Sequence, residues 1–209
     1  MADTKENILI AALRLFAKDG YEAVSVSKIA GELGMTKGAL YKHYKNKRDI
    51  FDSIFERVCS LDIERSKEAG VPEKDFDEMP EPFGNTSLES LVTYMQAQFY
   101  YWTEDEIACN FRRMLTLEQY RTTEMTELYQ KVMTSGPISY ITDLFREMIR
   151  HGAISQGNPK EMAMELFAPF YFLLSISDAA VNKEEKQEVA QMYMAHIKRF
   201  QEKYTAKAL

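Results

Sequence analysis

The sequence has few of the residues from which metal sites and redox centres are usually built. Its 209 residues include two cysteines and three histidines. Cys59 and Cys109 stand in neither a CxxC nor a CxxH spacing, so no zinc motif is indicated. Two free thiols in a cytosolic protein are the simpler interpretation, and a redox switch is the alternative.

Long apolar segments are also missing. The longest apolar run, from Phe167 to Leu174, has eight residues and contains Pro169. A helix that spans a bilayer needs about 20 apolar residues. The N-terminal segment shows no signal-peptide pattern, because its first amphipathic stretch carries Lys5, Glu6 and Arg14. We therefore expect a cytoplasmic protein without a membrane partner.

Arrangements of catalytic residues are not recognisable either. The three histidines, His43, His151 and His196, fall in separate predicted elements. No Ser/His/Asp motif, glycine-rich phosphate loop or cluster of metal ligands is present in the sequence. These absences argue against an enzyme, and we expect no catalytic residue, cofactor or metal.

The segment from Ser25 to Lys47 has the pattern of two short helices joined by a tight turn. Ser25 and Thr36 are suitable N-caps, because their hydroxyl groups accept backbone N–H groups that lack a helical partner. Gly34 is suited to the left-handed conformation of the turn. This pattern is typical of a helix-turn-helix, although any amphipathic helix pair can imitate it.

The charge of the sequence is distributed in a way that favours DNA binding at this segment. The whole chain has a net charge of −6, but residues 25–48 carry six basic residues and one acid. Gly38 lies inside the second predicted helix, where glycine costs roughly 1 kcal/mol relative to alanine, which suggests a close approach of another backbone. A basic end on an acidic body suits a protein that presents one end to phosphates.

Together, these residues closely resemble the N-terminal domain of TetR/AcrR-type transcriptional regulators. The resemblance covers about the first quarter of the chain, from Gly20-Tyr21 through Leu33-Gly34-Met35-Thr36-Lys37-Gly38-Ala39-Leu40-Tyr41 to Asn46-Lys47. It implies an all-α fold of about nine helices. Residues 1–46 would form a three-helix DNA-binding domain with a helix-turn-helix, and residues 47–209 a larger ligand-binding and dimerisation domain.

The family pattern places the recognition helix at about Thr36 to Tyr44. Lys37 is the first candidate for a contact with a base edge, with Ser27 and Lys42 as second choices. Gly38 would let the backbone approach the duplex. The side chain of His43 either contacts DNA or packs between helices. The remaining candidates would contact phosphates and fix the register: Ser25, Lys28, Thr36, Tyr41, His43 and Lys47.

Beyond residue 46, the apolar spacing predicts helices throughout and no strand. A long helix is expected from Asn46 to about Ala69, followed by an exposed linker from Gly70 to Thr86. The last two long helices begin at Asn158-Pro159 and Asn182 and are unusually apolar. They could be plain core, but the resemblance implies that they form a homodimer, so the operator would be a near-palindrome.

The body is rich in aromatic residues, which for each single residue more often means core than ligand lining. The excess of tyrosine favours a largely apolar or aromatic effector with a few polar groups, because a buried hydroxyl needs a partner. A cationic ligand is the alternative, since acids lie near the aromatics. The candidate lining residues are Phe99, Trp102, Phe111, Met114, Tyr120, Phe145, Phe170 and Tyr171.

The function expected from this sequence is a ligand-responsive transcriptional regulator that binds DNA. Repression released by a small-molecule effector comes from the resemblance alone. The alternative within the same fold is a structural or division-associated DNA-binding protein that needs no ligand. An enzyme would require motifs that the sequence does not offer.

Overall fold

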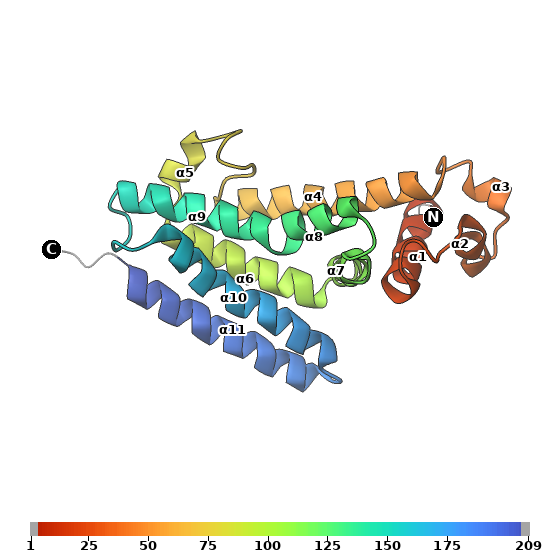
Figure 1. Cartoon of the computed structure of the whole chain (residues 1–209). Coiled ribbons are helices and arrows are strands. Elements are labelled where there is room, and N and C mark those ends of the chain that lie inside the picture. The colour runs from red at the N-terminus through yellow and green to blue at the C-terminus, as the bar shows by residue number, and fades with distance from the viewer. Residues whose placement is uncertain (1–3, 206–209) are drawn as a thin grey trace. The chain divides into compact units, whose positions relative to one another are not determined.

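The computed structural model describes residues 4–205, and these form eleven helices and one isolated β-bridge between Ile154 and Thr205 (Figure 1). The all-α class is therefore confirmed. More helices are present than the expected nine, partly because the predicted linker contains a short helix, α5 (Glu81–Asn85), with a proline in its first turn. Asp3 and Glu6 have the spacing of a capping box in the sequence, and Asp3 lies outside the described residues.

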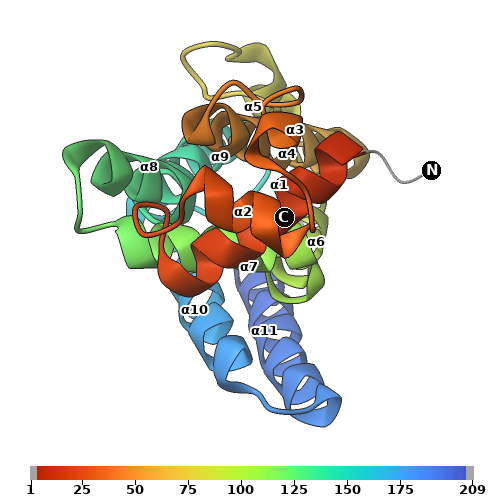
Figure 2. The same ribbon diagram turned by 90° about the vertical axis from the view of Figure 1, so that its right-hand side faces the viewer.

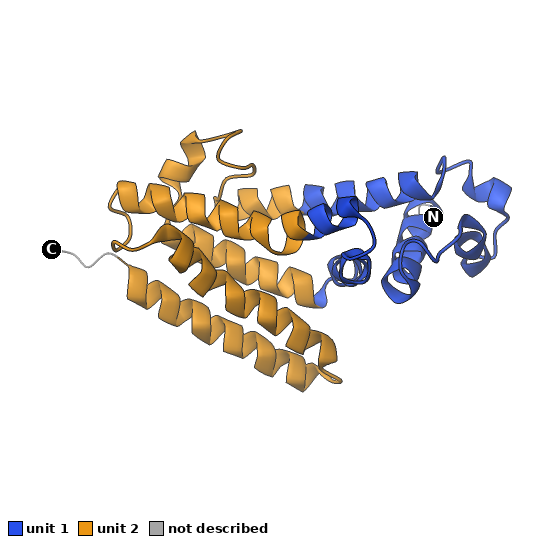
Figure 3. Cartoon of the chain, viewed as in Figure 1, with its two compact units in different colours: residues 1–61, 104–129 blue, residues 62–103, 130–209 orange. Residues whose placement is uncertain are grey.

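The chain divides into two compact units (Figure 3). Unit 1 comprises residues 1–61 and 104–129, and unit 2 comprises residues 62–103 and 130–209. The long helix α4 (Lys47–Ala69), expected from the sequence, contributes residues to both units. The sequence predicts a different division, into a DNA-binding domain up to residue 46 and a ligand-binding domain after it. That functional division stays a prediction.

Unit 1 contains the predicted helix-turn-helix together with four further helices or parts of helices. Its elements are α1 (Thr4–Asp19), α2 (Val26–Glu32), α3 (Lys37–Leu40), the first part of α4, α7 (Glu106–Glu118) and the first part of α8 (Thr123–Met133). Ile8 of α1, Ile29 of α2 and Ile54 of α4 have no exposed surface, and α1 packs against α2. α1 also packs along α7, a contact that the local sequence pattern does not reveal.

Two glycines end helices in unit 1 as the sequence predicts. Gly20 follows α1 with a φ of 85°, and Gly34 follows α2 with a φ of 62°. Side chains rarely tolerate this left-handed region, whereas glycine has no Cβ to clash. These turns set the directions in which α2 and α3 leave their predecessors.

The recognition helix is shorter than predicted. α3 spans Lys37–Leu40 rather than Thr36 to Tyr44. Beyond Leu40 the backbone tightens, because the N–H groups of Lys42 and His43 donate to carbonyls only three residues earlier. The ring of Tyr44 is 2% exposed and its hydroxyl donates to the carbonyl of Lys5 at 3.2 Å, so the end of this segment is fixed by the core.

Unit 2 is a bundle in which α6 (Leu88–Glu104), α9 (Ser135–Arg150), α10 (Pro159–Ala179) and α11 (Lys183–Tyr204) lie beside one another (Figures 1 and 2). Asn158 and Asn182 cap α10 and α11 as predicted, since each side chain accepts backbone N–H groups of the first turn. At the start of α6 the cap is the hydroxyl of Ser87. Thr86, the last residue of the linker that was predicted to be exposed, is buried and donates to the carbonyl of Pro82.

α10 is the one helix in the described part of the chain that is long and apolar enough to cross a membrane by length and composition. The core helix of a soluble protein passes the same test. In unit 2, α10 packs against both α9 and α11, which accounts for much of its apolar surface.

A matched pair of glycine substitutions tests the turn after α1. Gly20→Ala should lower the free energy of unfolding by about 1–3 kcal/mol, because alanine is strained at positive φ. Its Cβ would also lie 2.5 Å from Oε1 of Glu118. Gly31→Ala, inside α2 and without any atom within 4 Å of the new Cβ, should raise it by about 0.5–1 kcal/mol.

The measurement is urea unfolding followed by circular dichroism. Equal effects of the two substitutions would contradict a special role for the turn at Gly20.

Candidate nucleic-acid interface

The predicted DNA-contacting residues gather around α2, α3 and the start of α4, all within unit 1. Their backbone positions are fixed by two side-chain caps. The hydroxyl of Ser25 accepts the N–H of Lys28 at 3.2 Å, and that of Thr36 accepts the N–H of Ala39 at 3.1 Å. Both caps were predicted, and both use the hydroxyl groups that were also proposed to touch phosphates.

Most of the predicted contact residues have side chains that solvent reaches. His43 is among them, so its packing between helices is not what the structure has. Gly34 and Thr36, which lie in the turn between α2 and α3, are exposed to solvent as well. The exposed candidates are Ser25, Ser27, Lys28, Thr36, Lys37, Gly38, Tyr41, Lys42 and His43.

Two lysines on this surface already have partners. The ammonium group of Lys28 lies 2.7 Å from Oδ2 of Asp19, and its hydrogen bond lowers the pKa of that carboxyl. Lys37 lies over the ring of Tyr41, with 5.6 Å from Nζ to the ring centroid. These are exposed interactions, which contribute little to stability and exchange readily for other partners such as phosphates.

Lys47 differs from the other candidates because its ammonium group is built into the fold. It donates to the carbonyls of Tyr21 and Glu22 at 2.7 and 3.3 Å, and it lies 4.2 Å from the centroid of the Tyr21 ring. These groups belong to the loop that leaves α1. The side chain therefore ties this loop to the start of α4, a role that the sequence prediction of a phosphate contact did not include.

Ion pairs inside unit 1 join α1 and α4 to α7 and α8. Arg14 of α1 bonds to both carboxylate oxygens of Glu106, one of them at 3.0 Å. Arg48 of α4 lies 2.6 Å from the carboxylate of Glu124. Sequence reasoning missed these contacts because their partners are more than 70 residues apart. The only sequence signal was the acid that each of the two later helices carries in its first turn.

The eight predicted lining residues for a ligand are found in two different units. Six are buried: Phe99, Trp102, Phe111, Met114, Phe145 and Phe170. Tyr120 is 89% exposed and Tyr171 is 40% exposed, so these two are surface residues rather than buried ones. The ligand-binding role of the set stays a prediction.

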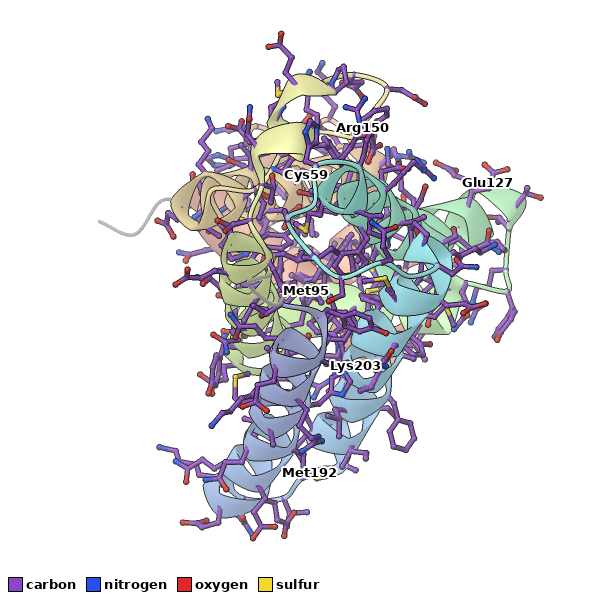
Figure 4. All side chains as sticks on the ribbon, turned by 90° about the vertical axis from the view of Figure 1, so that its left-hand side faces the viewer. Cys59, Met95, Glu127, Arg150, Met192 and Lys203 are labelled. Carbon is purple, nitrogen blue, oxygen red and sulfur yellow. The ribbon has the colours of Figure 1, made fainter. Side chains whose placement is uncertain are left out.

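A surface cavity of about 300 Å³ lies between α5 and the end of α9 in unit 2. The carboxylate of Glu147 is almost buried there and is bonded by Arg150, which Figure 4 labels. None of the eight predicted lining residues borders this cavity; its walls are Phe76, Pro80, Glu81, Gly84, Asn85, Glu147, Arg150 and His151. Among the described residues, no group of three or more potential metal ligands is found.

A polar cluster in unit 2 was not anticipated from the sequence. The hydroxyl of Tyr94 donates to Oδ1 of Asp62 at 2.9 Å, and the amide of Gln98 donates to the same oxygen. Burial, followed by the nearby Asp62 charge, raises the pKa of Tyr94. Helical spacing marks Tyr94 and Gln98 as one turn apart on α6, but it does not reveal their partner on α4.

Comparison with known proteins agrees with the geometry of unit 1. Residues 8–54 match the family model described as bacterial regulatory proteins, tetR family. The TetC protein of transposon Tn10 from Escherichia coli is 37% identical over 84% of this chain and 93% of its own length. The chain belongs to the TetR family and is a DNA-binding transcriptional regulator of that family.

Two other similarities show less about this chain. The transcriptional regulator AcrR of Shigella flexneri is 39% identical over 34% of this chain, which spans about a third (35%) of the length of that relative. Among solved structures, the SmeT–triclosan complex aligns with 97% of this chain and 91% of its own at a TM-score of 0.67 and 22% identity. The latter similarity shows the fold alone.

The contacts of Lys47 predict a stability effect rather than a simple loss of DNA affinity. Lys47→Ala should lower the free energy of unfolding by about 1–2 kcal/mol, because two carbonyls lose a charged donor and the Tyr21 ring loses its cation. Lys42→Ala, at an exposed lysine near α3, should change it by less than about 0.5 kcal/mol. Urea titration of both variants measures the free energy of unfolding. If Lys47→Ala left it unchanged, the structural role of Lys47 would be contradicted.

Proposed function

We propose that this chain is a repressor that leaves a near-palindromic operator when a small, largely apolar or aromatic effector binds. The observation that carries the proposal is the exposed basic surface around α3, whose backbone is fixed by the caps at Ser25 and Thr36. Lys37 is the base-reading residue of this proposal, and Lys28, Tyr41 and His43 contact phosphates.

Repression and ligand binding draw support from similar proteins. SmeT is described as the repressor of the Stenotrophomonas maltophilia multidrug efflux pump SmeDEF, and one of its structures contains triclosan. The aromatic content of the helical body suits an effector of comparable apolar character. The effector would act by population shift, because a ligand that prefers one conformation favours it by its differential affinity.

A homodimer through α10 and α11 is part of the proposal. A stripe of exposed apolar side chains supports it: Met164 is 49% exposed, Tyr171 40% and Phe172 64% on α10, and Met192 is 56% exposed on α11. Figure 4 labels Met192. On a helix, residues separated by seven or eight positions share a face. A second copy of the chain would cover this apolar face and would present a second reading head to DNA.

The proposed location is the cytoplasm, where operator DNA is found. Among the described residues, Cys59 and Cys109 form no disulfide, which suits that compartment.

Genome-wide mapping of bound sites tests the regulator against the structural alternative. A regulator should occupy one or a few near-palindromic sites beside promoters. Dozens of scattered sites would instead favour a structural or division-associated role.

Two lysine substitutions separate base reading from phosphate contact. Lys37→Ala should relax the base preference at one position of each half-site, because a lysine donates to guanine O6 and N7. Lys28→Ala should weaken binding to all sequences alike and flatten the slope of log affinity against log salt by about one. Fluorescence anisotropy with permuted operators at several salt concentrations measures both.

An unchanged base preference in the Lys37→Ala variant, together with weaker binding, would assign sequence reading to another residue.

A charge placed on the apolar stripe tests the dimer. Phe172→Lys should yield monomers at micromolar concentration, since an unpaired ammonium would be buried between the two copies. Leu117→Lys, at a residue of α7 that is 46% exposed, should leave the oligomeric state unchanged. Analytical ultracentrifugation measures the mass of each variant, and a dimeric Phe172→Lys protein with an unaltered dissociation constant would place the interface elsewhere.

A further inference from the structure

The core of unit 2 contains a hydroxyl group that the described residues leave without a hydrogen bond. Tyr193 of α11 has no exposed surface, and its OH group has no hydrogen-bond partner. Nearly all buried polar groups in proteins are hydrogen-bonded, because an unpaired one keeps the cost of losing water. An orphan hydroxyl at the centre of a helical bundle therefore needs an explanation.

The surroundings of Tyr193 are aromatic and come from three helices. Its ring stacks on Phe99 of α6 with 4.5 Å between centroids, and it meets Phe170 of α10 edge-on at 5.5 Å. Phe167 stacks on Phe170 at 5.3 Å and extends the cluster along α10. These side chains offer flat apolar surface but no strong acceptor or donor for the hydroxyl.

A second orphan atom lies one helical turn further along α11. Nε2 of His196 is buried without a hydrogen-bond partner, and the His196 and Tyr193 ring centroids are 6.3 Å apart. Burial, with Arg199 nearby, lowers the pKa of His196, so the imidazole is neutral at pH 7. A neutral ring nitrogen can accept a hydrogen bond, and a tyrosine hydroxyl can donate one.

We propose that a neutral aromatic molecule with one hydroxyl group binds at this cluster, its ring among Phe99, Phe167 and Phe170 and its hydroxyl bonded to Tyr193 and His196. The oxygen of the ligand accepts from Tyr193, and its proton is donated to Nε2 of His196. An anion or cation is disfavoured among the three phenylalanine rings, because these rings provide no opposite charge to offset its burial. The charged groups near His196 are Arg199 and Glu165, and Glu165 already pairs with Lys203. The rings of Phe99, Phe167, Phe170 and Tyr193 are at most 6% exposed and pack on one another, so the proposed ligand requires a conformation in which they have parted.

The proposal rests on the proposed function only for what the ligand does to DNA binding. The binding site itself stands on the two unpaired polar atoms and the aromatic rings around them. It adds the chemical class of the effector and two α11 residues that the predicted lining set does not contain.

Equilibrium dialysis of the full chain with 2-naphthol, naphthalene and 2-naphthoate tests the site. We expect 2-naphthol to bind best, and 2-naphthoate at least about tenfold more weakly because its charge would be buried. Tyr193→Phe removes only the hydroxyl group, so it should weaken the binding of 2-naphthol by about five- to twentyfold. The affinity for naphthalene should change less than about twofold, since it has no group for that hydroxyl to bind.

Thermal unfolding without ligand provides a readout that a merely structural tyrosine would not give. Tyr193→Phe should raise the melting temperature by about 2–4 °C, because the unpaired polar atom is removed and the ring is kept. Tyr100→Phe is the matched control on α6, where the ring is 42% exposed, and it should change neither the affinity nor the melting temperature.

Three results would overturn the site: no binding of 2-naphthol up to 1 mM, equal binding by Tyr193→Phe and wild type, or a lower melting temperature of Tyr193→Phe. The last would mean that an internal water satisfies the hydroxyl. Operator binding is measured separately. If 2-naphthol requires Tyr193 but leaves operator affinity unchanged, the site stands and the effector role in the proposed function fails.

Discussion

The reading end of this protein depends on one junction, where Lys47 holds the loop that leaves α1. Its ammonium group bonds to two carbonyls of that loop and lies over the Tyr21 ring, which itself packs between Phe16 and Phe51 with centroids 5.1 and 5.2 Å away. The loop leads into α2, and Lys47 begins α4. The two ends of the helix-turn-helix are thereby fixed against one another, and α3 lies between them.

This junction explains why so short a recognition element can be well defined. α3 has four residues, far fewer than an isolated helix needs to be stable in water. Its order comes from the Thr36 cap at one end and the buried Tyr44 at the other. Between these two anchors, Lys37, Gly38 and Tyr41 face solvent without contributing to the core. Under the proposed function, their substitution would therefore change DNA recognition at little cost in stability.

The membership of α7 in unit 1 changes how the two functions of the chain would be connected. The long helix predicted from the sequence, α4, links the helix-turn-helix covalently to the rest of the chain. The structure adds the packing of α1 along α7 and the ion pairs of Arg14 and Arg48 with later helices. Under the proposed function, an effector could act on the reading helices through α7 as well as through α4.

Much of the reading end could be predicted from residues close in sequence, because caps, glycine turns and apolar spacing act within a few residues. Ser25, Gly34, Thr36 and Asn158 each have the role their local pattern indicated. The local pattern overestimated the length of α3, because the core position of Tyr44 decides where the backbone tightens. It also missed α5, which is too short to show a period.

Other features were decided by tertiary structure alone, because they join residues that are far apart in the chain. The sequence offered Lys47 as a phosphate contact, which stays a prediction, and only the structure shows that it also ties the Tyr21 carbonyl to the start of α4. The sequence indicated that some buried tyrosine would need a partner, but only the packing of α6, α10 and α11 showed that Tyr193 is the one left without. Helical period tells which face a residue occupies, and only the fold tells what that face meets.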